Sequence, residues 1–217
     1  NGEHVILERF DDFFIEGRPY LDKIVMRIIT DPAARAIAYE NGEIHMGAFE
    51  SLPRIINRLK KVDSLTVTSD GYGAIGPVDW LAMNTTKGPL SDVRVRKAIA
   101  YAVDKNFIHK ALMQGTASDS TSGIHPDSPF YAAQEGYDVD LEKSATLLDE
   151  AGFPVKDGKR MTLTIDFGWP GVKPQVEYVK AALKKVNIDV QVRASADFPT
   201  WAKKMGTMDF DMSWDTV

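Results

Sequence analysis

Apolar residues recur along the chain with two periods, and each period predicts one kind of element. Alternating apolar positions predict strands at residues 5–9, 23–29, 43–47, 65–69, 80–84, 161–167, 188–192 and 210–214. Apolar positions three and four residues apart predict helices, which begin near Pro32, Pro53, Asp92, Asp104, Asp140 and Val172, with a further short helix around Trp201. Predicted strands and helices therefore alternate along most of the chain.

Several helix boundaries have signals of their own. Asp31, Asp92 (or Ser91) and Asp140 each precede a predicted helix, where a side-chain oxygen can accept a free backbone N–H. Gly152 follows the helix after Asp140 and fits the position just past a helix end. The helix after Asp92 should bury one face, which consists of Val95, Ala98, Ile99 and Ala102.

The order of elements in the second half of the chain predicts a parallel sheet. A strand at 161–167, an apolar-striped helix at 172–186 and a strand at 188–192 form a crossover unit. The fold class is therefore expected to be α/β. A stretch rich in Gly and Pro at 70–78 is the expected boundary between two lobes, residues 1–69 and 70–217.

Composition narrows the function. The 217 residues include 44% hydrophobic and 26% charged residues, with a net charge of −5 and no cysteine. Basic residues are scattered, so nucleic acid is not an expected partner. Because the chain has no cysteine, disulfides and thiolate metal sites are excluded. The chain begins at Asn1 without a methionine and stops at Val217 inside a predicted strand, so we expect it to be a fragment.

Catalytic and cofactor motifs are weak. Gly71 to Gly76 fit a dinucleotide-binding glycine pattern, but a predicted strand follows where that motif needs a helix, so a loop is favoured. The four histidines are dispersed without metal-ligand spacing, and no serine lies in a nucleophile motif. His125 lies in a Ser-, Thr- and Pro-rich segment at 115–137, a candidate functional loop, and is retained as a candidate ligand contact.

The tryptophans are the more informative residues. Trp80, Trp169, Trp201 and Trp214 all lie near predicted element ends, where α/β sheets present residues to a ligand crevice. An indole offers a large flat apolar face and one hydrogen-bond donor. Core packing buries the ring equally well, so each tryptophan remains open to both interpretations.

Six segments follow one another in a recognisable order. They are PYLDKIVMRII at 19–29, NGEI at 41–44, LAMN at 81–84, PLSDVRVRKAIAYAVDK at 89–105, ATLLDEAG at 145–152 and DFDM at 209–212. Together they resemble the family 5 solute-binding proteins, the peptide, dipeptide and nickel group that serves ABC importers. The resemblance covers nearly the whole chain.

The resemblance implies a periplasmic-binding-protein-like, two-lobed fold of type II, with one lobe largely present and part of the other. It implies a periplasmic monomer that closes on a peptide or similar small organic solute without catalysis, and neither a cofactor nor a metal site is expected in this chain. The solute would be delivered to the membrane subunits of an ABC importer. Ligand contacts are expected first from Trp214 and Trp201, then from Trp169, Trp80 and His125.

Two other classes of function stay open at this point. The same fold can serve as the ligand-sensing module of a signalling protein, or the chain can be a lobe of a hydrolase whose nucleophile lies elsewhere. A signal peptide upstream would favour transport, whereas a fused regulatory domain would favour sensing.

Overall fold

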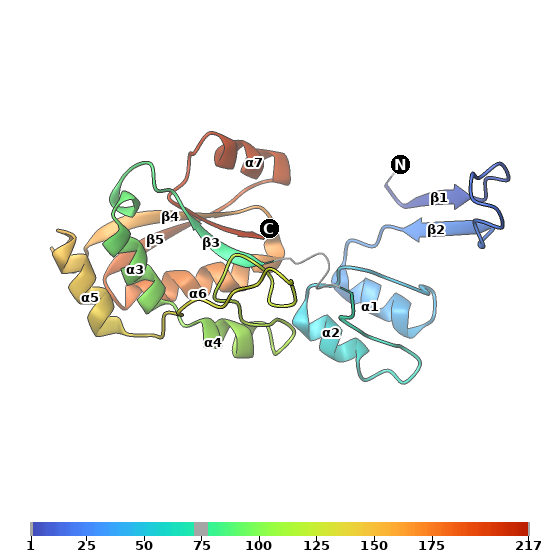
Figure 1. Ribbon diagram of the computed structural model, residues 1–217, viewed down its shortest axis with the longest axis horizontal. Coiled ribbons are helices and arrows are strands. Elements are labelled where there is room, and N and C mark those ends of the chain that lie inside the picture. The colour runs from blue at the N-terminus through green and yellow to red at the C-terminus, as the bar shows by residue number, and fades with distance from the viewer. Residues whose placement is uncertain (1, 72–77, 217) are drawn as a thin grey trace. The chain divides into compact units, whose positions relative to one another are not determined.

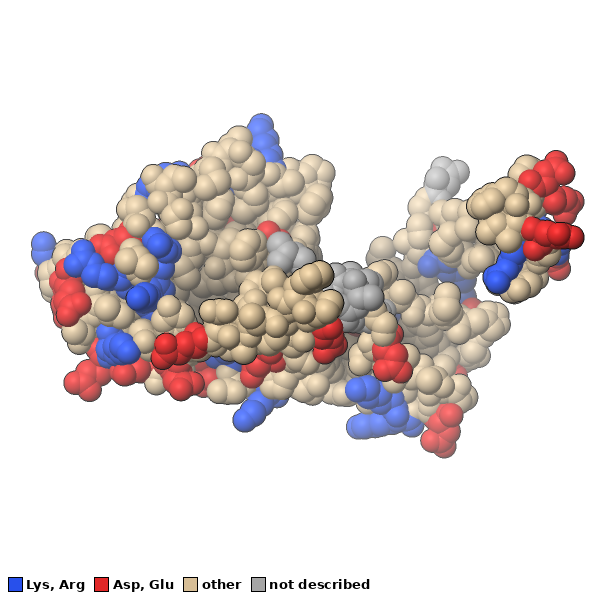
Figure 2. All heavy atoms as spheres, viewed as in Figure 1, with Lys and Arg blue, Asp and Glu red and all other residues tan. Residues whose placement is uncertain are grey.

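The computed structural model of the chain describes residues 2–71 and 78–216 (Figure 1). Its contacts divide it into two units. Unit 1 comprises Asn1–Glu50 and Arg54–Val67, and unit 2 comprises Ser51–Pro53 and Thr68–Val217. On the face drawn in Figure 2, acidic and basic side chains are interspersed. No helix in the described ranges is long and apolar enough to cross a membrane.

Unit 1 contains a two-stranded antiparallel sheet and two helices. Strand β1 (His4–Glu8) pairs with β2 (Lys23–Arg27), and helices α1 (Pro32–Glu40) and α2 (Pro53–Leu59) follow. Asp31 begins α1 as the sequence predicts, accepting a hydrogen bond of 2.7 Å from the Ala34 N–H. Both strands of the sheet are solvent-exposed along their whole length.

Unit 2 is built on a four-stranded sheet in the order β3-β6-β4-β5. Its strands are β3 (Asp79–Met83), β4 (Met161–Phe167), β5 (Ile188–Ala194) and β6 (Met212–Thr216). Strand β4 runs parallel to both β5 and β6, whereas β3 runs antiparallel to β6. Helix α6 (Lys173–Lys184) connects β4 to β5, which confirms the predicted crossover unit.

Helices cover both faces of this sheet. Helices α3 (Val93–Ala102), α5 (Leu141–Glu150) and α6 lie on one side, and α7 (Phe198–Gly206) lies on the other (Figure 1). Short helical segments complete the unit: η2 (Pro89–Ser91), α4 (Lys105–Phe107), η3 (Ile108–Leu112) and η4 (Pro170–Val172). The main core lies on the α3 and α6 side, where β4 contributes Leu163, Ile165 and Phe167.

The predicted helix face after Asp92 is confirmed residue by residue. The buried side chains of α3 are Val95, Ala98, Ile99 and Ala102. The Asp92 carboxylate accepts a 2.8 Å hydrogen bond from the Arg94 N–H, and Asp140 caps α5 in the same way through the Lys143 N–H. The capping residues predicted for α3 and α5, and the buried face predicted for α3, are therefore confirmed.

Three predicted elements differ from the structure. Residues 43–47 and 65–69 alternate in polarity but form no strand, because no strand among the described residues supplies a hydrogen-bonded partner for either segment. The helix predicted from Asp104 is interrupted, since α4 ends at Phe107 and continues as the π-helix η3. Periodicity alone does not distinguish these geometries.

Residues 72–76 of the glycine pattern lie outside the described part of the chain. The next described element is strand β3, whereas a dinucleotide-binding motif needs a helix there.

Candidate functional site

The candidate site is the edge of the four-stranded sheet where the parallel strands end. Strands β4, β5 and β6 point the same way, so Phe167, Ala194 and Thr216 finish at this edge. Strand β3 runs the opposite way, and its first residue, Asp79, pairs with Thr216. Open α/β sheets bind ligands at this carboxyl edge, because loops and helix starts converge there.

An aromatic cluster of Trp169, Phe198 and Trp201 lies beside this edge. Trp169 follows β4, and the other two rings belong to α7, which follows β5. Trp169 stacks on Phe198 with ring centroids 5.6 Å apart and an interplanar angle of 21°. Trp201 contacts both rings, at 5.3 Å from Trp169 and 5.4 Å from Phe198. Phe198 is 54% exposed, so the cluster keeps an apolar surface open to solvent.

Trp201 is fixed at the base of this cluster. The ring is only 7% exposed, and its Nε1–H donates a 3.0 Å hydrogen bond to the buried Ser213 Oγ. The neighbouring Gly168 leaves room for the ring, since a Cβ there would lie 3.0 Å from Trp201 Cγ. Asp197 begins α7 by accepting a 2.8 Å hydrogen bond from the Thr200 N–H. Trp201 therefore serves as the anchor and Phe198 as the exposed surface.

Trp80 and Trp214 lie on opposite faces of the sheet. Trp80 is opposite Asp215 and Trp214 is opposite Leu81 in the β3–β6 pairing, and successive strand residues alternate in direction. Trp80 is 46% exposed and shares its face with Ser213 and hence with the aromatic cluster. Trp214 is 6% exposed and packs in the main core, and among the described residues its indole N–H has no hydrogen-bond partner.

His125 lies in the long loop, where it contacts Asp127 of the same loop. Its Nδ1 accepts a 3.1 Å hydrogen bond from the Asp127 N–H, and the Asp127 carboxylate lies 3.8 Å away. A hollow of about 590 Å³ on the surface of unit 2 is lined by residues 69–71 and by residues 127–130 of the same loop, and His125 is not one of the lining residues. The five residues predicted from the sequence are thus distributed over a shared aromatic face, the core and a separate loop.

A buried ionic cluster next to the aromatic cluster escapes prediction from the sequence. The Asp166 carboxylate on β4 is fully buried, with Arg193 Nη2 at 2.6 Å and Lys204 Nζ at 2.8 Å. The hydrogen bond to Asp166 raises the pKa of Arg193, and burial opposes that shift. Two cations compensate the carboxylate for its lost hydration. Strand alternation could have placed Asp166 away from the main core, but not beside Lys204, which is 38 residues away.

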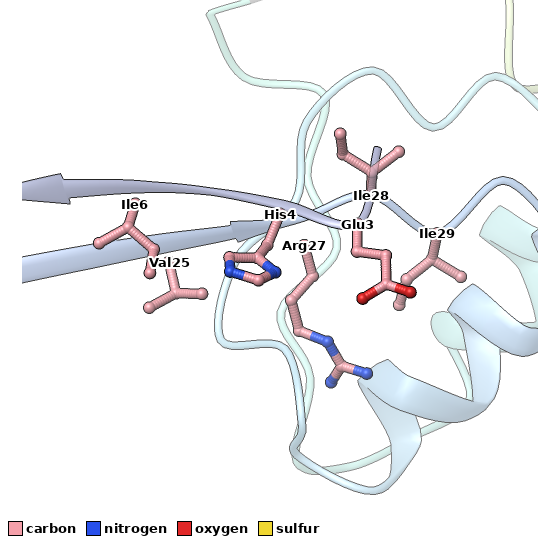
Figure 3. Close-up of a pocket in the computed structure, with 7 residues that line it drawn as sticks. All are labelled: Glu3, His4, Ile6, Val25, Arg27, Ile28 and Ile29. Atoms are coloured by element: carbon pink, nitrogen blue, oxygen red, sulfur yellow. The ribbon is translucent and has the colours of Figure 1, made fainter. Parts of the chain in front are cut away.

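Another hollow, of about 470 Å³, lies on the β1–β2 sheet of unit 1 (Figure 3). His4 and Arg27 are register partners there and lie side by side in Figure 3. The lining residues are Glu3, His4, Ile6, Val25, Arg27, Ile28 and Ile29. None of the five predicted ligand contacts is among them. In the described ranges, no three His, Cys, Asp or Glu side chains are grouped to hold a metal ion.

Known proteins are similar to this chain in both sequence and fold. A Brucella ovis protein, provisionally named as an ABC transporter peptide-binding protein, is 29% identical over 198 residues, or 89% of this chain and 36% of that protein. Among solved structures, NikA from Brucella suis in complex with Fe(III)-EDTA matches at 29% identity with a TM-score of 0.84. The match covers 100% of this chain and 45% of NikA.

A second solved structure gives the same result. The periplasmic binding protein DppA from Helicobacter pylori, associated with an ABC transporter and in complex with the peptide STSA, is 27% identical with a TM-score of 0.85. The match covers 100% of this chain and 40% of DppA. These likenesses confirm the predicted fold class, an α/β fold of the type II periplasmic binding proteins, present in part. The model of the bacterial extracellular solute-binding proteins, family 5 (middle), matches residues 1–216, and the chain belongs to that family.

Proposed function

We propose that the protein containing this chain captures a peptide or similar small organic solute and delivers it unaltered to an ABC importer. Capture would take place between two lobes outside the cytoplasmic membrane, in the periplasm. Family membership over residues 1–216 supports this role. The partners would be the solute and the importer's membrane subunits, without nucleic acid, and the protein would act as a monomer without catalysis or cofactor.

The observation that carries the proposal is the aromatic cluster at the carboxyl edge. An exposed ring held on a buried, hydrogen-bonded tryptophan offers a rigid apolar wall that loses little entropy when a solute packs on it. Such a wall tolerates varied side chains, whereas the backbone groups of strand ends can bind polar atoms of the solute. The two structural relatives hold a metal chelate and a peptide, so the solute class is a matter for experiment.

The five residues predicted from the sequence enter this proposal in different ways. Trp201 would support the wall, Trp169 would form part of it and Trp80 would extend it on the same face of the sheet. Trp214 would contribute through its unpaired indole N–H, the described residues offering that group no partner. His125 would act from the loop at 115–137. We also propose that residues 1–69 and 70–217 contribute to two different lobes.

The test uses Phe198→Ala in the full-length protein. Removal of the exposed ring should weaken binding of a peptide such as trialanine by about fivefold, because about 40 Å² of apolar surface buried against the ring contributes about 1 kcal/mol. Isothermal titration calorimetry measures the change. Thermal unfolding should hardly change, because more than half of the Phe198 side chain is already in water.

Phe107→Ala is the matched control. Phe107 is 44% exposed and stacks on Tyr178 with the same interplanar angle of 21°, but it lies on α4 and not in the aromatic cluster. Its removal should leave the affinity unchanged. Equal losses in both variants, or none in Phe198→Ala, would remove the aromatic cluster from the binding site.

A further inference from the structure

Helix α7 has few apolar contacts to hold it on the sheet. Trp201 is its only buried residue, and Phe198 at its start is largely exposed. A helix with one buried side chain can slide or rotate at little cost, because its position is not fixed by a packed face. Its placement therefore depends on the polar contacts that it makes as well as on the packing of Trp201 against Gly168 and Trp169.

Those contacts come from two neighbouring positions of the sheet. Asp166 on β4 pairs in register with Ser213 on β6, and both lie on the α7 face. Asp166 binds Lys204 at 2.8 Å, and Ser213 accepts the Trp201 indole N–H at 3.0 Å. Lys204 and Trp201 are three residues apart, so they lie on the same side of the helix. One turn of α7 is thus held at two adjacent points.

Arg193 completes the arrangement from β5. It binds the other oxygen of Asp166 at 2.6 Å and donates a 3.2 Å hydrogen bond to the Asp209 carbonyl, in the segment that returns from α7 to β6. The same buried carboxylate therefore orients both the helix and, through Arg193, the segment that follows it. Buried ion pairs contribute little net stability compared with apolar packing, but in some proteins they fix one geometry.

We propose that Asp166 is a positioning residue for the ligand-binding aromatic cluster. By holding Lys204, its carboxylate sets the place at which α7 presents Trp201 and Phe198 beside Trp169. The effect on solute affinity rests on the proposed function, whereas the effect on the position of Trp201 does not.

The test measures the Trp201 indole N–H in the full-length protein with ¹⁵N-labelled tryptophan. Trp201→Phe assigns its resonance, and hydrogen exchange of that N–H reports the bond to Ser213. In Asp166→Asn and in Lys204→Met, exchange should become at least about tenfold faster, as expected for loss of a charge-assisted contact. The Trp214 N–H, on the opposite face, is the internal reference and should keep its rate.

Lys184→Met is the matched control, because Lys184 forms a similar pair with Asp189 at 2.7 Å on the exposed surface. It should leave the Trp201 rate unchanged. If Asp166→Asn does not fold, Lys204→Met decides alone, since it leaves Asp166 paired with Arg193. An unchanged Trp201 rate in Lys204→Met would overturn the inference.

Calorimetric titration with trialanine separates the two proposals. Weaker binding in Lys204→Met, together with faster exchange, would support both of them. Faster exchange in the variant, with no peptide or other solute bound by the unaltered protein, would sustain the positioning role and count against the proposed function.

Discussion

Gly168 shows how one small residue determines the shape of the candidate site. A Cβ at this position would lie 3.0 Å from Trp201 Cγ and 3.2 Å from Cδ2, closer than packed carbon atoms normally approach. The requirement comes from the neighbouring ring, because Gly168 is not among the residues with positive φ. Its absent side chain is what lets Trp201 lie against the end of β4.

We expect Gly168→Ala to displace Trp201 and to lower the free energy of unfolding by about 1 kcal/mol, the usual cost of overfilling a packed site. Near-ultraviolet circular dichroism would report the ring, and urea denaturation the stability. Gly171→Ala is the control, since nothing lies within 4 Å of a Cβ there. If both substitutions behave alike, the close approach to Trp201 is not what requires glycine.

Asp166 is a charged residue that is fully buried on the α7 face of the sheet. Its carboxylate is fully buried and paired with two cations, although its neighbours Ile165 and Phe167 face the apolar core. Alternation along β4 accounts for the difference in direction. The two neighbours stabilise the sheet from the core side, whereas Asp166 anchors α7 from the other side.

At the scale of elements, the capping residue and the apolar face of α3 both predict the helix that the structure shows. Asp92 accepts the Arg94 N–H and also binds the Arg94 guanidinium at 2.6 Å. These hydrogen bonds to Arg94, opposed by a small cost of burial, lower the pKa of Asp92 below its ordinary value of 3.8. The charged form of Asp92 is therefore favoured by folding.

The sign of the resulting pH dependence follows from that lowered pKa. Because the folded pKa lies below the unfolded one, the contribution of Asp92 is complete above about pH 5 and is lost as the pH falls below 3.8. We expect Asp92→Ala to lower Tm by about 2 °C at pH 7 and by progressively less below pH 3.8.

Thermal unfolding monitored by far-ultraviolet circular dichroism between pH 7 and pH 3 would measure this difference. Asp92→Asn is the informative comparison, since asparagine also caps helices but carries no charge. It should restore part of the lost Tm at pH 7. Because neither asparagine nor alanine titrates, the Tm difference between these two variants should be the same at every pH. A gap between Asp92→Ala and the unaltered protein that grows in acid would contradict the assigned sign.

Helix α7 and strand β5 are the elements whose local sequence says least about the contacts that they make. The pattern of apolar positions predicts a short helix at Trp201 and a strand at 188–192, and both are present. Neither pattern indicates that Arg193 and Lys204 converge on one carboxylate. That convergence is a property of the α7 face of the sheet, and it sets the position of the aromatic cluster.

For the whole molecule, the chain spans less than half the length of the relatives that it matches. The chain spans 36% of the length of its Brucella ovis relative and 40% of DppA. The proposed role in transport predicts that the complete protein holds a solute and releases it chemically unchanged. A hydrolase lobe would instead release a product.

We expect a cognate solute at about 100 times its Kd to stabilise the folded protein by about 2.7 kcal/mol, because it binds the folded state alone. Differential scanning fluorimetry against a library of peptides, sugars and metal chelates would identify the solute. Mass spectrometry of the released solute should return its starting mass. A changed mass after incubation would refute binding without catalysis.

The sequence by itself determined the features that depend on neighbours along the chain. The α3 face of Val95, Ala98, Ile99 and Ala102 was predictable because helical neighbours are three and four residues apart. The parallel pairing of β4 with β5 followed from the strand-helix-strand order. Trp169 and Trp201 were both predicted at element ends, and they are in contact.

Only the tertiary structure decided which of these residues meet. Residues 43–47 and 65–69 had the pattern of strands but find no strand partner among the described residues, and a strand requires a hydrogen-bonded neighbour. The separation of Trp80 from Trp214 depends on the β3–β6 register, and the joining of Asp166 to Lys204 depends on α7 crossing β4. Such contacts are invisible to local periodicity, because they join residues that are far apart along the chain.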